Sequence, residues 1–118
     1  MSYDQLQYQL SSGNTTYSNE SLNASLFREL IGELELYDFV VLEPSAPLEN
    51  SIYLQAASLE EPETHEMGQM VVEIRFQQTK RKFRHYRLLT TNHDQILRLF
   101  MDYWGAQRVP NIEQWEDI

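Results

Sequence analysis

Glutamate, arginine and histidine residues occur in two adjoining stretches of alternating sequence in the second half of the chain. Glu73 and Arg75 share one face of the first stretch, and His85 lies in the second. Histidine titrates near neutral pH, which suits general acid and base catalysis. A carboxylate, an imidazole and a guanidinium are also the groups that metal-free ribonucleases use, so this set could cleave a phosphodiester.

The same residues also suit a purely structural role. A cross-strand pair of Glu and Arg stabilises a solvated sheet face without forming an active site. The sequence contains no glycine-rich phosphate loop and no nucleophile elbow. We therefore predict no catalytic residues, and an enzyme that uses Glu73 and His85 is the less favoured alternative.

A basic segment at residues 80–87 holds five of the nine Lys and Arg residues together with two aromatic residues. Single-stranded nucleic acid is bound by such sets, in which cations contact phosphates and rings stack on bases. Basic residues at a hairpin tip also protect an exposed strand from pairing with other chains. Because most of the chain is acidic, we do not expect it to bind nucleic acid.

Thiol and metal chemistry have little basis in the sequence. The chain has no cysteine, which excludes disulfides and thiolate metal sites and fits a reducing compartment. His65 and Glu66 lie in the acidic segment 58–68, and carboxylate oxygens are ligands for divalent cations. The spacing of a calcium-binding loop is absent, however, and Pro62 interrupts the segment. We predict a solvated loop here, with no metal and no cofactor.

Charge is unevenly distributed along the chain, which has a net charge of −9. Residues 1–70 contain twelve acidic residues and the single base Arg28, whereas the last 48 residues contain eight bases and six acids. Such a field repels nucleic acid and favours a basic protein partner by steering the encounter. Acidity that only maintains solubility is the alternative interpretation.

The elements that position these residues follow from hydrophobic periodicity. At 118 residues, with 42% hydrophobic residues, the chain is expected to form a single domain over residues 1–118. Alternation predicts strands, and apolar stripes at spacings of three and four predict two amphipathic helices. The predicted strands cover residues 5–10, 39–42, 52–56, 70–77 and 83–89, and the helical stripes cover residues 22–34 and 96–104.

The predicted order is therefore β-α-β-β-β-β-α, an α+β fold with a mostly antiparallel sheet and both helices packed on one face. We expect the first strand at a sheet edge. The predicted caps are Ser18 or Ser21 for the first helix and Thr91 for the second. The other sheet face stays open and carries Tyr53, among other polar residues, so a partner could dock there.

The N-terminal residues lack the basic and apolar regions of a signal peptide. No stretch approaches the roughly 18 apolar residues of a membrane span. We expect a cytoplasmic protein that does not associate with a membrane.

About the last 80 residues form a pattern of strands, helix and Pro-to-Trp tail. The segments that carry this pattern are Phe39-Val-Val-Leu42, Ile52-Tyr-Leu-Gln55, Val72-Glu-Ile-Arg75, His85-Tyr86, Tyr103-Trp104 and Val109-Pro110-x4-Trp115. Together these segments resemble the small immunity proteins of bacterial polymorphic toxin systems.

This resemblance implies a non-catalytic cytoplasmic inhibitor that binds a co-encoded toxin domain, often a nuclease with a basic cleft. Acidic charge suits that role, because a cleft that holds phosphates also attracts carboxylates. An interaction or structural protein that forms a homo-oligomer, such as a dimer, is the main alternative. The residues expected at the partner interface are Tyr53, Glu60, Glu61, Glu63, Glu66, Glu73 and Arg75.

Overall fold

A computed structural model of the protein describes residues 6–34, 38–58 and 69–118. It confirms the predicted α+β class, with two helices and a largely sequential set of antiparallel strands. The elements are β1 (Tyr8–Ser12), β2 (Thr15–Tyr17), the short 3-10 helix η1 (Asn19–Ser21), α1 (Ala24–Gly32), β3 (Phe39–Pro44), β4 (Ser51–Ser58), β5 (Met70–Gln77), β6 (Phe83–Thr90), α2 (His93–Gly105) and β7 (Glu116–Asp117).

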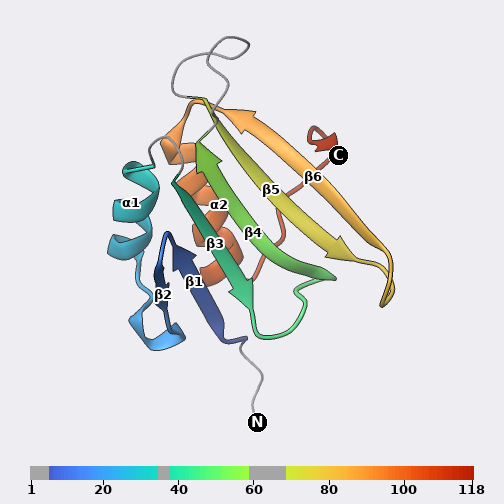
Figure 1. Cartoon of the computed structure of the whole chain (residues 1–118), viewed down its shortest axis with the longest axis horizontal. Helices are drawn as coiled ribbons and strands as arrows, with labels where there is room; N and C mark the ends of the chain where they lie inside the picture. Colours follow the sequence, from blue (N-terminus) through green and yellow to red (C-terminus); the bar gives the residue numbers. More distant parts are fainter. Residues whose placement is uncertain (1–5, 35–37, 59–68) are drawn as a thin grey trace.

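The strands form one sheet in the order β2-β1-β3-β4-β5-β6-β7, with every neighbouring pair antiparallel (Figure 1). The central meander from β3 to β6 agrees with the prediction. The expected edge position of the first strand is wrong, because β2 pairs with its outer side. The turn between them contains Gly13, whose φ of 58° lies in the left-handed region that glycine adopts without strain.

Both helices pack on one face of the sheet: Figure 1 shows α2 and the C-terminal tail behind the strands and α1 to the left, where it contacts α2. The rings of Phe27 in α1 and Phe100 in α2 are fully buried and lie 6.4 Å apart. Within the described ranges, no helix has the length and apolar character needed to cross a membrane. The other buried apolar residues are Tyr8, Leu10, Leu22, Ile31, Val40, Leu42, Leu54, Ala56, Met70, Val72, Ile74, Ile96 and Tyr103.

A buried polar chain ties α2 to the sheet. The Tyr103 hydroxyl lies 2.8 Å from the Ser51 hydroxyl, which itself donates to the carbonyl of Leu48 at 2.5 Å. The Tyr8 hydroxyl donates to the backbone carbonyl of Tyr103 at 2.8 Å. Burial raises the pKa of Tyr8 and of Tyr103 to about 12, so both hydroxyls stay protonated far above neutral pH.

Asparagine side chains cap both helices. The Asn23 side chain accepts a hydrogen bond from the Leu26 amide at 2.8 Å, so α1 begins after the residues η1 occupies. Asn92 accepts from two backbone amides at the start of α2. The predicted caps at serine and threonine residues are therefore wrong, although asparagine caps through the same chemistry.

The C-terminal tail packs against the core and then reaches the edge of β6 as the short strand β7. Arg87 Nε donates to Glu116 Oε1 at 2.6 Å, and Arg84 pairs with Asp117. The predicted order of elements ended with the second helix and did not include this strand. The two ion pairs neutralise part of the positive charge of β6.

Candidate functional site

The candidate site is the sheet face opposite the helices, which we call the open face. Strand residues with side chains on this face are mostly half-buried, in contrast to the fully buried residues that alternate with them. Tyr53, Glu73 and Arg75 lie here, on the face for which they were predicted. The four glutamates expected at the interface, Glu60, Glu61, Glu63 and Glu66, lie outside the described residues.

Strand register arranges the polar side chains of the open face in two adjacent cross-strand rows. In one row Arg75 lies between Tyr53 and His85, and in the next row Glu73 lies between Gln55 and Arg87. Glu73 and His85 are therefore diagonal neighbours rather than direct cross-strand partners. This separation weakens the case for a carboxylate and an imidazole that act on one substrate atom.

The Tyr53 hydroxyl contacts the residue at the other end of its row, His85. It lies 2.9 Å from Nε2 of His85, with the two rings tilted and their centroids 6.2 Å apart. Burial raises the pKa of Tyr53, the negative charge of Glu73 raises it further, and Arg75 opposes both effects. A tyrosine hydroxyl is protonated at neutral pH in any case, so Tyr53 can donate or accept a hydrogen bond at this face.

Among the described residues, Arg75 contacts an aromatic ring and pairs with no carboxylate. Its guanidinium carbon lies 4.0 Å from the centroid of the Phe83 ring, and its buried Nε has no hydrogen-bond partner among the described residues. The expected Glu and Arg pair on this face is also absent from the ion pairs of the described residues, because Arg87 bonds Glu116 instead of Glu73.

One end of the open face is apolar, which the sequence analysis missed. Phe39, Ala57, Val71 and Leu89 pair in register across four strands, and Val41 lies in the adjacent row on β3. Each is half-buried rather than buried. The available signal was the run of apolar residues on both faces of β3 and at the start of β5, where a solvated face would alternate with polar residues.

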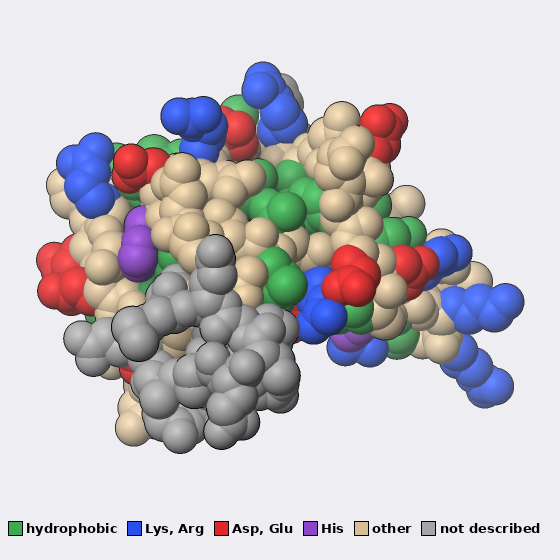
Figure 2. Space-filling model, turned by 90° about the horizontal axis from the view of Figure 1, so that it is seen from above, with side chains coloured by type: hydrophobic (Ala, Val, Ile, Leu, Met, Phe, Trp, Pro, Cys, Tyr) green, Lys and Arg blue, Asp and Glu red, His purple; other side chains and the backbone are tan. Residues whose placement is uncertain are grey.

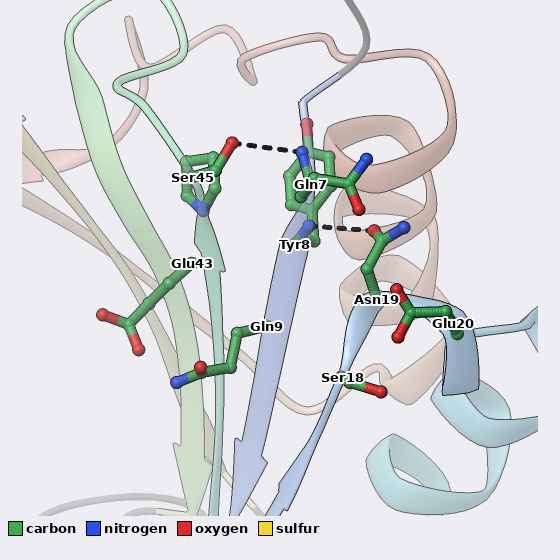
Figure 3. A pocket seen from close by; sticks show the side chains of 9 residues that line it. Gln7, Tyr8, Gln9, Ser18, Asn19, Glu20, Glu43 and Ser45 are labelled. Carbon is green, nitrogen blue, oxygen red and sulfur yellow. Dashed lines mark hydrogen bonds between the residues drawn. The ribbon is translucent and has the colours of Figure 1, made fainter.

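A hollow of about 400 Å³ adjoins the open face beside β1. Figure 3 shows Glu43 and Ser45 on one side of the strand, with Asn19 and Glu20 on the other. Side chains on both sides of the hollow accept hydrogen bonds from the backbone at the start of β1. The Gln7 amide donates to Ser45 Oγ at 3.1 Å, and the Tyr8 amide donates to the Asn19 side chain at 2.9 Å. The lining combines polar and apolar surface and includes the carboxylates of Glu20 and Glu43.

Chemistry beyond these groups finds no further support in the described part of the chain. No group of three or more His, Asp or Glu residues there is arranged to hold a metal ion. Comparisons of the chain with protein-family models, with curated proteins and with solved structures gave no match. The function is therefore inferred from the open face itself.

Proposed function

We propose that this protein is a non-catalytic binding protein whose open face docks another protein. The observation that carries the proposal is the composition of that face, where an apolar cluster adjoins rows that contain Tyr53, His85 and two arginines. Protein interfaces combine an apolar centre with polar surroundings, and their binding energy is concentrated in Tyr, Trp and Arg residues. A sheet is also rigid, so little conformational entropy is lost when a partner binds.

The biological role that fits this surface is inhibition of a toxin by direct binding, as in the immunity proteins of polymorphic toxin systems. Such a protein acts in the cytoplasm on a co-encoded toxin domain. The net charge of −9 favours a basic partner, such as a nuclease with a phosphate-binding cleft. Tyr53, Glu73 and Arg75 contribute to this interface in the proposal, together with the four glutamates of the segment 60–66.

Catalysis by the polar rows is a weaker candidate. Tyr53 and His85 do form the hydrogen-bonded pair that a general acid or base could use. The same bond occupies Nε2 of the imidazole, however, and Glu73 lies diagonally across from it. Cleavage of single-stranded RNA by the purified protein, lost in His85→Ala, would favour the enzyme over the binding protein.

The proposal predicts that a neighbouring gene encodes a toxin domain, and rescue of cells from that domain tests the binding function. Co-expression of the wild-type protein should restore growth, and the two proteins should co-purify. Val71→Asp introduces a charge into the apolar cluster and should abolish both effects. Ser25→Asp places the same charge on an exposed position of α1 and should change neither. Loss of rescue in both variants, with both folded, would contradict docking through the open face.

A further inference from the structure

We propose that the basic end of the open face docks an acidic segment of the partner protein. This end, which we call the basic tip, consists of Lys80, Arg81 and Lys82 in the turn between β5 and β6, with the Arg75 and Phe83 stack at its base. The inference rests on the proposed binding function and adds the chemistry of one contact. It concerns the end of the face away from the apolar cluster.

The turn presents its cations in an ordered arrangement. Thr79 Oγ1 accepts hydrogen bonds from the amides of Arg81 at 3.2 Å and Lys82 at 3.0 Å. The Gln78 amide donates to the carbonyl of Lys82 at 2.8 Å, which closes the turn. In Figure 2, Lys and Arg side chains project from the right-hand end of the molecule, where Figure 1 places this turn.

Among the described residues, no acidic side chain neutralises the charge of the basic tip. Lys80, Arg81 and Lys82 are exposed and form no ion pair with the residues that the structure describes. The acidic residues of β7 pair with the arginines of β6. Three exposed cations in one turn of an acidic protein are a local attraction for carboxylates.

The Phe83 side chain at the base of the tip adds an apolar surface beside these cations. Phe83 is 40% exposed although its ring is stacked on the Arg75 guanidinium. A guanidinium held against an aromatic ring is restrained, so less side-chain entropy is lost when a carboxylate binds it. The tip therefore offers an aromatic surface and one restrained guanidinium beside three exposed cations, which suits an acidic segment that also contains apolar residues.

The small size of the basic tip favours a short acidic protein segment over a nucleic acid. Nucleic acid binds through many phosphate contacts, and away from the tip the field of a protein with a net charge of −9 repels those phosphates. A short protein segment needs only a few carboxylates at one place, and the tip can supply their partners. One face of the Phe83 ring is also occupied by Arg75, which leaves less of the ring for stacking on bases.

The test measures binding of a short fluorescein-labelled peptide of alternating Glu and Tyr residues by fluorescence anisotropy at low salt. The triple variant K80E/R81E/K82E should weaken binding by at least about tenfold. The control R28E/R98E/R108E makes the same change in net charge at exposed positions elsewhere and should retain binding. Phe83→Ala should weaken binding roughly two- to fivefold, through loss of the ring contact.

Three outcomes would overturn the inference: no binding by the wild-type protein, equal loss in the two triple variants, or tighter binding of a single-stranded oligonucleotide of the same charge as the peptide. None of them contradicts docking through the apolar cluster, which Val71→Asp tests separately. If Val71→Asp abolishes rescue from the toxin while K80E/R81E/K82E retains it, the proposed function stands and the role of the basic tip is wrong.

Discussion

Removal of one buried hydroxyl should destabilise the protein in a manner that depends on pH. Tyr103→Phe deletes the hydroxyl that joins α2 to Ser51 on β4. Because the Ser51 hydroxyl donates to Leu48, Tyr103 must be the donor in this pair. The substitution leaves one acceptor in the core without its partner, which costs about 1 to 2 kcal/mol of unfolding free energy at neutral pH.

The contribution of the same hydroxyl to the unfolding free energy decreases at high pH. Its pKa is about 12 in the folded protein, because burial disfavours the phenolate, and about 10 in the unfolded chain. The unfolded state therefore ionises first as the pH rises above 10, and the stability that the protonated tyrosine contributes is lost between about pH 10 and pH 12. At about pH 11 this loss amounts to roughly 1.4 kcal/mol for one tyrosine.

The destabilisation by Tyr103→Phe should thus shrink to near zero at about pH 11, because the variant has no phenol to ionise at this position. Urea unfolding followed by far-UV circular dichroism at both pH values measures the difference. Tyr17→Phe is the control, since the Tyr17 hydroxyl forms no hydrogen bond within the described residues. If the unfolding free energies of wild type and Tyr103→Phe differ by the same amount at both pH values, the raised pKa of the Tyr103 hydroxyl is refuted.

Three further predictions concern the ends of helices, a turn and the edge of the sheet, each measured as a change in the urea unfolding midpoint. Asn23→Ala and Asn92→Ala should each cost about 1 kcal/mol through loss of a helix cap. Gly13→Ala should cost roughly 1 kcal/mol because its φ is positive, and an unchanged midpoint would place this turn in another conformation. Glu116→Gln should cost less than about 1 kcal/mol, because its ion pair with Arg87 is exposed.

The sequence predicted the central sheet well because apolar and polar residues alternate over much of β4 and β5. In β5, Val72 and Ile74 face the core, whereas Glu73 and Arg75 face the other side of the sheet. A shift of the strand register by one residue would bury these two charged side chains. The pairing of the polar rows followed from that register. The face of the sheet that carries Tyr53 was therefore available from the sequence.

Other features could not be predicted because local patterns do not report on them. The strand β2 consists of two exposed threonines and a tyrosine, so it has no apolar alternation and is recognised only by its partner β1. The apolar cluster of the open face depends on which residues of four strands align. The stack of Arg75 on Phe83 likewise joins two strands across a turn, and neither residue identifies the other in the sequence.

The central claim is that the open face binds the partner, and methyl NMR tests it most directly. The protein is labelled at valine and leucine methyl groups and titrated with the toxin domain. Signals of Val41, Val71 and Leu89 should shift or broaden, while those of Leu26 and Leu30 on α1 should stay in place. Shifts confined to the α1 methyl groups, with the open face unchanged, would contradict the claim.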